Sequence, residues 1–388
     1  MDRNLPWADF PQWLRTGNGV YWISGKAGSG KSTLMKHIFD NHRTRDYLIR
    51  WANKNQLCIA SFFFWNNGVH EQKSRSGLLR ALLHQILTQY SDLIPVVFAA
   101  EWTSQYSAVI NHTELPFAQW SLRKLITAFE ALIEQRLFLV NICFTIDGLD
   151  EFEGDHEELE VLTALFETTS SSTMSTVKVC FSSRPWVIFE DWFSSGPHLR
   201  LHNLTCHDIE LFISGKLNEN GRFQRLATRE PKMAPTLIRE IVDSARDVFL
   251  WVHLVVRSLL QGLKNHDDIA IPQSRLRLLP KELEPLYSHL PSLIEPCYML
   301  WASKALQIVR LSLEYASHPS GISNRAGKGR LPPSIAEFYI AIMEEDKLYM
   351  LQDMSLNELA MRCQETELHL TARCAGLTET TSLEISEL

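Results

Sequence analysis

Apolar residues in the first two hundred positions of the chain form short continuous runs, which are separated by stretches with helical spacing. The runs cover residues 19–24, 57–65, 137–146, 177–181 and 198–201. A continuous apolar run is typical of a strand that is buried on both faces, as in a parallel sheet between two layers of helices. The pattern therefore predicts an α/β fold in which a parallel sheet carries helices on both faces.

Beyond about residue 205 the strand pattern disappears, and apolar residues recur with helical spacing. Two amphipathic stretches lie within residues 237–263, and further helix is predicted within 279–313. Residues 318–333 are rich in Pro, Gly, Ser and Asn, a composition typical of a loop or linker. We therefore expect three parts, an α/β domain over 1–204, a helical lid region over 205–290 and a C-terminal helical module over 291–388.

The turn after the first predicted strand carries a phosphate-binding motif of the form G-x-x-x-x-G-K-[ST], also known as Walker A. Its residues are Gly25, Lys26, Ala27, Gly28, Ser29, Gly30, Lys31 and Ser32, and Thr33 extends the start of the predicted helix. The glycines let successive backbone N–H groups converge on phosphate oxygens, and the helix N-terminus adds partial positive charge. We expect Lys31 to reach the β- and γ-phosphates and Ser32 to place its hydroxyl on Mg²⁺.

The strand predicted over 137–146 leads into a group of acidic residues. Asp147 follows the strand directly, and Asp150 and Glu151 come shortly after it. A carboxylate at the carboxyl end of a buried parallel strand lies beside phosphates that are bound at the same edge of the sheet. We therefore expect Asp147 to hold Mg²⁺, as a Walker B residue does, and Asp150 or Glu151 to orient or deprotonate the attacking water.

The strand predicted over 177–181 leads toward Arg184, which Pro185 follows directly. An arginine at this end of the sheet could sense the terminal phosphate of a bound nucleotide. An arginine that only solvates a loop or pairs with an acid would produce the same pattern, so the residue types alone leave both interpretations open.

Composition excludes several classes of protein. The chain has 388 residues, of which 45% are hydrophobic and 21% charged, so it can bury the cores of two or three domains. Its 38 basic and 45 acidic residues give a net charge of −7, and this balance offers no reason to expect nucleic-acid binding. The longest apolar stretches are too short to span a bilayer, and the N-terminus lacks the apolar core of a signal peptide. We therefore expect a cytoplasmic protein.

The cysteines and histidines do not indicate a structural metal or a disulfide framework. Seven cysteines are spread singly along the chain, with no C-x-x-C pair among them. The acidic and histidine residues near 70 and 156 do not form H-E-x-x-H, so a metalloprotease is not supported. Mg²⁺ bound together with a nucleotide is the only metal that the sequence predicts.

Several segments besides the two phosphate motifs resemble the NACHT NTPases of the STAND class, in particular the filamentous-fungal branch related to nephrocystin-3-like N-terminal domains. These segments are 10–14, 21–26, 31–36, 62–66, 77–80, 120–122, 182–185, 248–252 and 372–377. The resemblance implies an additional-strand P-loop core, followed by helical and winged-helix-like modules that clamp the nucleotide. It implies that Arg184 is a phosphate sensor. It also implies slow nucleotide hydrolysis that serves as a switch for protein assembly.

Four features depart from the pattern of this family. Asp247 stands where we expect a glycine, and the linker at 318–333 is unusual. The phosphate motif begins so early that no effector domain would fit before it, and the chain ends near the point where sensor repeats would begin. These ends suggest a truncated member. Its protein partners or self-association would then act through domains absent from this chain.

Two other classes stay open from the residues themselves. One is a P-loop phosphotransferase or motor-type ATPase with a helical substrate domain, and the other is an interaction module that binds nucleotide without hydrolysis. The base is also open, because the motifs contact only phosphates. No N-K-x-D motif follows the strand at 137–146 to select guanine, so ATP is preferred while GTP stays possible.

Overall fold

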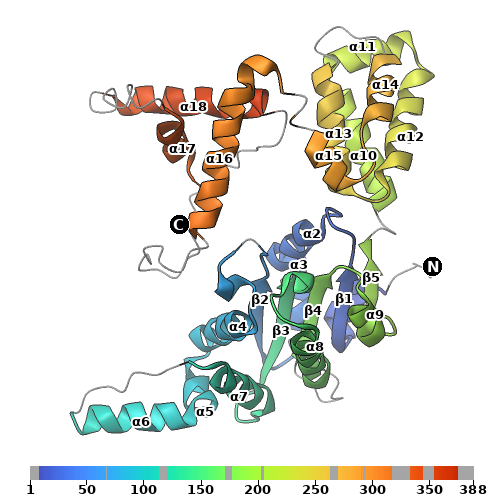
Figure 1. Cartoon of the computed structure of the whole chain (residues 1–388). Coiled ribbons are helices and arrows are strands. Elements are labelled where there is room, and N and C mark those ends of the chain that lie inside the picture. Colours follow the sequence, from blue (N-terminus) through green and yellow to red (C-terminus); the bar gives the residue numbers. More distant parts are fainter. Residues whose placement is uncertain are drawn as a thin grey trace. The chain divides into compact units, whose positions relative to one another are not determined.

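The computed structural model describes residues 8–66, 68–112, 120–170, 177–201, 205–262, 270–289, 291, 294–316, 333–343 and 354–374. The chain divides into two compact units, Met1–Leu204 and Thr205–Leu388. Figure 1 shows the helices and strands of both units.

A five-stranded parallel sheet forms the centre of the first unit (Figure 1). Its strands are β1 (Gly19–Ser24), β2 (Gln56–Phe63), β3 (Val140–Asp147), β4 (Val177–Ser183) and β5 (His198–Arg200). They lie in the order β2-β3-β4-β1-β5, and each neighbouring pair is parallel. The parallel sheet expected from the apolar runs is confirmed, and β4 lies between β1 and β3.

Four of the five predicted strands have different bounds in the structure, and β1 keeps the predicted ones. The strand expected to begin at residue 137 begins at Val140, and Leu137 and Leu139 are 77% and 71% exposed. Val140 pairs with Gln56, the first residue of β2, so β3 begins level with the start of β2. Likewise the strand expected over 57–65 ends at Phe63.

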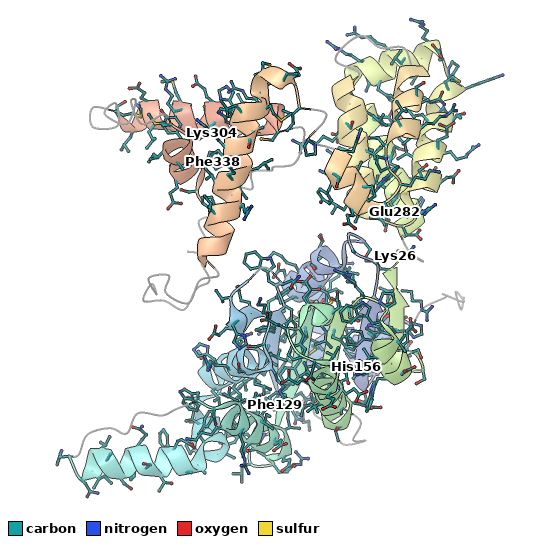
Figure 2. The ribbon with its side chains drawn as sticks, viewed as in Figure 1. Lys26, Phe129, His156, Glu282, Lys304 and Phe338 are labelled. Atoms are coloured by element: carbon teal, nitrogen blue, oxygen red, sulfur yellow. The ribbon has the colours of Figure 1, made fainter. Side chains whose placement is uncertain are left out.

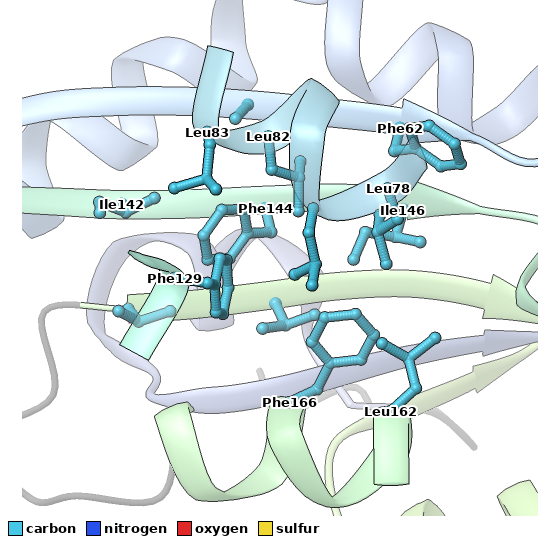
Figure 3. Close-up of a cluster of buried hydrophobic side chains, with 14 of the residues drawn as sticks. Phe62, Leu78, Leu82, Leu83, Phe129, Ile142, Phe144, Ile146, Leu162 and Phe166 are labelled. Atoms are coloured by element: carbon cyan, nitrogen blue, oxygen red, sulfur yellow. The ribbon is translucent and has the colours of Figure 1, made fainter. Parts of the chain in front are cut away.

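Helices cover both faces of this sheet, because successive residues of each strand point to opposite sides. One face packs against four helices, α4 (Arg75–Gln89), α7 (Leu122–Glu134), α8 (His156–Ser170) and α9 (Val187–Phe193). Figure 3 shows part of this core, in which the rings of Phe129 and Phe144 lie 5.6 Å apart between their centroids. The opposite face packs against α1 (Phe10–Thr16), α2 (Lys31–Asp40) and α3 (His42–Ala52).

The sequence did not mark several helices of this unit individually. Among them are α3, α5 (Ile94–Val97) and α6 (Ala99–Ile110). On α3 only Leu48 and Ala52 are buried, so the apolar stripe that marks a helix is too thin to recognise. Short 3₁₀ helices complete the unit, namely η1 (His70–Gln72), η2 (Ser91–Leu93) and η3 (Leu149–Glu151).

The described part of the second unit is all helical and has two separate hydrophobic cores. The first core belongs to α10 (Thr205–Asn218), α11 (Gly221–Arg229), α12 (Met233–Ala245), α13 (Phe249–Gly262), α14 (Ala270–Leu278) and α15 (Leu283–His289). The second belongs to η7 (Pro296–Tyr298), α16 (Met299–Ala316), α17 (Ile335–Ile342) and α18 (Leu356–Arg373). The loop predicted at 318–333 lies outside the described residues except for residue 333.

The turn between α12 and α13 explains why a glycine was expected at residue 247. Arg246 and Asp247 have φ angles of 46° and 67°, so both lie in the left-handed region. Glycine adopts this region without strain, and Asp is among the few other residues that tolerate it. The backbone geometry of a glycine turn is therefore kept although Asp247 replaces the glycine.

Candidate functional site

The turn from β1 to α2 holds the predicted phosphate motif. The main-chain N of Gly25 donates to the carbonyl of Ser183 at 3.2 Å, which ties the start of the turn to β4. Gly28 and Gly30 have φ angles of 70° and 91°, and Gly30 directly precedes α2. Most other residues would be strained at these angles, so the glycines allow the chain to turn sharply from strand to helix.

Lys31 is the first residue of α2 and folds back over this turn. Its Nζ donates to the carbonyl of Gly25 at 2.8 Å and to that of Lys26 at 3.1 Å. Burial is the largest influence on the Lys31 ammonium and lowers its pKa. The lysine thus sits inside the turn, where a bound anion would favour its charged form.

The charged residues predicted for the site influence the charge of Lys31. After burial, the charges of four residues have the largest influence on the pKa of Lys31. Asp150, Asp147 and Glu151 raise this pKa, and Arg184 lowers it. Such effects need short distances, so the structure brings these four residues to the phosphate turn. They come from the ends of β3 and β4 and from η3, which all meet at one edge of the sheet.

Other residues of the motif differ in exposure. Lys26, which Figure 2 labels, is exposed, as are Ala27, Ser32 and Thr33. Ser29 is buried. A Cβ added to Gly25 would lie only 2.5 Å from the Oγ of Ser29, so the turn has no space for a side chain at residue 25. The hydroxyls of Ser29 and of Ser24, the last residue of β1, are buried without a hydrogen-bond partner among the described residues. Because buried hydroxyls are normally paired, these two indicate that the turn accommodates a polar ligand or water.

Asp147 ends β3 and is held by Ser182, which is not among the site residues expected from the sequence. The Ser182 hydroxyl donates to Asp147 Oδ1 at 2.5 Å, and it accepts from the main-chain N of Gly148 at 3.0 Å. Asp147 is 3% exposed, and its Oδ2 accepts no hydrogen bond from the part of the chain that the structure describes. One carboxylate oxygen is therefore positioned by the protein while the other stays available.

Asp150 and Glu151 each have a protein partner. Asp150 Oδ2 lies 2.9 Å from Arg184 Nε, and its Oδ1 accepts from the main-chain N of Arg184 at 3.0 Å. Glu151 Oε2 accepts from the main-chain N of Asn66, in the loop after β2, at 2.8 Å. Arg184 therefore pairs with an acid in this structure, which was the alternative interpretation of its position, while it also lies near the phosphate turn.

The chemistry of these residues fits Mg²⁺ held together with a nucleotide. Among the described residues, no group of three or more His, Cys, Asp and Glu side chains could hold a metal ion. Mg²⁺ usually needs only one or two protein ligands, because phosphates and waters supply the others. Asp147 Oδ2 and the exposed hydroxyl of Ser32 are suitable oxygen ligands of this kind.

The strand order and the turn between β1 and α2 define the first unit as an α/β domain of the P-loop type. Residues 5–184 match the family model that is described as Nephrocystin 3, N-terminal. The match supports the resemblance to NACHT and nephrocystin-3-like proteins for the first unit. It ends at Arg184, far before the C-terminal segments on which the sequence resemblance also rests.

Comparison with solved structures and with curated proteins adds little. A structure titled "Structure of Drosophila ORC bound to DNA" is 16% identical, and the match covers 92% of this chain and 82% of that chain with a TM-score of 0.37. A TM-score this low supports no conclusion about fold or function. No curated protein matches the chain.

None of the helices in the described ranges is long and apolar enough to cross a membrane.

Proposed function

We propose that the first unit binds ATP, or GTP, with Mg²⁺ and hydrolyses it slowly, and that the nucleotide acts as a switch for protein assembly in the cytoplasm. The observation that supports this most is the position of Lys31, whose Nζ lies against the carbonyls of Gly25 and Lys26 within the turn. A lysine held over a glycine turn at a helix N-terminus is suited to bind the phosphates of a nucleotide. The family match over residues 5–184 supports the same function.

The charges of the site fit the needs of phosphoryl transfer. We assign the backbone of Gly25–Ser32 and the Lys31 ammonium to the phosphates, and Asp147 and Ser32 to Mg²⁺. Bound Mg²⁺ would neutralise charge that develops on the phosphate oxygens. Positioned positive groups of this kind stabilise a transition state without new covalent chemistry by the protein.

The contact between Asp150 and Arg184 suggests how a bound triphosphate and a bound diphosphate would have different effects on the site. A terminal phosphate that drew the Arg184 guanidinium toward itself would break its contact with Asp150 Oδ2. That carboxylate oxygen would then be free to orient the attacking water, a task for which Glu151 is the other candidate. The terminal phosphate would thereby favour one of two arrangements of the site, as a nucleotide switch requires.

Nucleotide binding by matched lysine variants tests this function. We expect Lys31→Ala to weaken the binding of a fluorescent ATP or GTP analogue about 10- to 100-fold, the effect of losing one charged hydrogen-bond donor. Lys36→Ala is the control, because Lys36 lies on the same helix, is exposed and pairs with Asp40 at 3.1 Å. Equal binding by wild type and Lys31→Ala would refute the proposed site.

Turnover and mass then separate the three classes of function. A switch should release phosphate slowly. Its molecular mass measured by light scattering should differ between the protein with a bound diphosphate and the protein with a bound non-hydrolysable triphosphate. Rapid turnover without a partner would instead favour a phosphotransferase or motor ATPase. Tight stoichiometric nucleotide without turnover would favour a non-hydrolysing interaction module.

A further inference from the structure

Two adjacent serines end β4, and their hydroxyls make different contacts. Ser182 Oγ donates to Asp147 Oδ1 and accepts from the main-chain N of Gly148. Ser183 Oγ accepts from Trp22 Nε1 at 2.8 Å and donates to its neighbour's carbonyl, that of Arg184, at 3.0 Å. Both serines are fully buried. Successive residues of a strand face opposite sides, so Ser182 shares a face with Asp147 while Ser183 faces the Trp22 side.

The hydrogen bonds of Ser182 can run in only one direction. An ionised carboxylate only accepts and a main-chain N–H only donates, so the hydroxyl hydrogen of Ser182 must point to Asp147 Oδ1. Its lone pair then receives the N–H of Gly148. A hydroxyl bonded in both directions has no freedom to rotate, and it therefore fixes the carboxylate of Asp147 as well.

Gly148 strengthens this arrangement. Its φ angle of 68° turns the chain away from the strand immediately after Asp147. Ser182 thus binds both the side chain of Asp147 and the backbone at the turn that follows it. The 2.5 Å contact has the length of a hydrogen bond to a charged acceptor, which is roughly twice as strong as a neutral one.

We propose that Ser182 is a positioning residue for Mg²⁺. It holds Asp147 through Oδ1 so that Oδ2 is directed to the metal that accompanies the nucleotide. This inference rests on the proposed function, and it adds a residue that acts on Asp147 without touching the phosphates. Partners that orient a metal-binding carboxylate commonly change metal affinity 10- to 100-fold when they are removed.

The test is a Mg²⁺ titration of nucleotide binding by the full chain. Binding of a fluorescent nucleotide is first measured in excess EDTA and then at rising Mg²⁺. We expect Ser182→Ala to leave the metal-free affinity within about twofold of wild type and to raise the half-saturating Mg²⁺ concentration about 10-fold or more. Ser182→Thr keeps the hydroxyl and should restore the Mg²⁺ response of wild type.

Ser183→Ala is the matched control. It also removes a buried hydroxyl and leaves Trp22 Nε1 without its partner, so we expect both it and Ser182→Ala to lower the melting temperature. It should not change the Mg²⁺ response, because Ser183 does not contact Asp147. If Ser182→Ala fails to fold, Ser182→Cys gives the same test, since a thiol of similar size is only a weak donor.

The outcomes separate this inference from the proposed function. If wild type binds no nucleotide, the proposed function is wrong and the inference falls with it. If wild type binds nucleotide with Mg²⁺ and Ser182→Ala has an unchanged Mg²⁺ response, only the inference is wrong. A shift of equal size in Ser183→Ala would show that Ser182 is merely structural.

Discussion

Arg184 binds both carboxylate oxygens of Asp150, with Nε 2.9 Å from Oδ2 and the main-chain N 3.0 Å from Oδ1. The Asp150 side chain is 3% exposed, whereas that of Arg184 is 47% exposed. The ion pair is therefore unequal, because the acid depends on these two contacts while the arginine can reach solvent. This asymmetry leads to a first prediction about stability.

We expect Asp150→Asn to cost about 1.5–3 kcal/mol of folding free energy, the range for hydrogen bonds to charged groups. The amide nitrogen of Asn cannot accept from Arg184 Nε, and the volume is unchanged, so no cavity contributes. Arg184→Lys should cost less, because it keeps the positive charge and the main-chain donor. Urea denaturation of both variants measures the difference in the free energy of unfolding. An equal loss in the two variants would contradict the conclusion that Asp150 depends on the ion pair more than Arg184 does.

A second prediction concerns Lys178, which lies in β4 and is fully buried. Its Nζ donates to the carbonyls of Trp13 and Leu14 at 2.6 and 2.7 Å and lies 4.4 Å from the centre of the Trp51 ring. Burial lowers its pKa to about 8, and the nearby Cys143 opposes this shift. The lysine therefore connects the last turn of α1 to the sheet at the cost of burying a charge.

The pH dependence of stability should reveal this lysine. Between pH 8 and the usual lysine pKa near 10.5, the unfolded chain holds a proton that the folded chain has released, so the contribution of Lys178 to stability rises with pH. Burial also raises the pKa of Cys58 and of Cys143 to about 12, and these thiols lower stability above pH 9. The useful window is thus pH 7.5 to 9.

Across that window we expect wild type to gain about 1 kcal/mol of unfolding free energy relative to Lys178→Met. The comparison cancels most of the contribution of the cysteines, which both proteins share. Lys36→Met, which removes an exposed lysine, is the control and should parallel wild type. Parallel curves for wild type and Lys178→Met would contradict the lowered pKa.

A third prediction concerns Gly77, near the start of α4. A Cβ at this position would lie 1.7 Å from the carbonyl oxygen of Glu71, which belongs to η1. Gly77→Ala must therefore shift the backbone, and we expect a loss of about 3 kcal/mol. Gly215 in α10 has nothing within 4 Å of a Cβ, so Gly215→Ala should instead add about 0.5–1 kcal/mol from helix propensity. Thermal unfolding of the two variants should move in opposite directions.

A fourth prediction concerns the turn between α3 and β2. Asn53 has φ 55° and ψ −109°, and the main-chain N of Asn55 donates to the carbonyl of Ala52 at 2.9 Å. These values define a type II′ turn, whose first central position favours glycine. Asn53→Gly should be more stable than Asn53→Ala by about 1 kcal/mol, because only glycine adopts this conformation without strain. Equal melting temperatures of the two variants would contradict the strained turn.

The sequence predicted the parallel sheet and the phosphate turn because both depend on local patterns. Buried strands appear as apolar runs, and the positive φ angles of Gly28 and Gly30 in the turn after β1 favour glycine. The helices α3 and α6 were missed, since each buries too few apolar side chains to show a stripe. The start of β3 was placed too early, because apolar Leu137 and Leu139 lie outside the sheet.

The sequence by itself determined which residues could bind phosphate and that Asp147, Asp150, Glu151 and Arg184 follow strands of one sheet. Only the tertiary structure decided their partners. It placed β4 between β1 and β3, so that Ser182 reaches Asp147 and Asp150 pairs with Arg184. The physical reason is that apolar periodicity reports whether a strand is buried, whereas a hydrogen bond across strands depends on sheet order and register, which no single strand encodes.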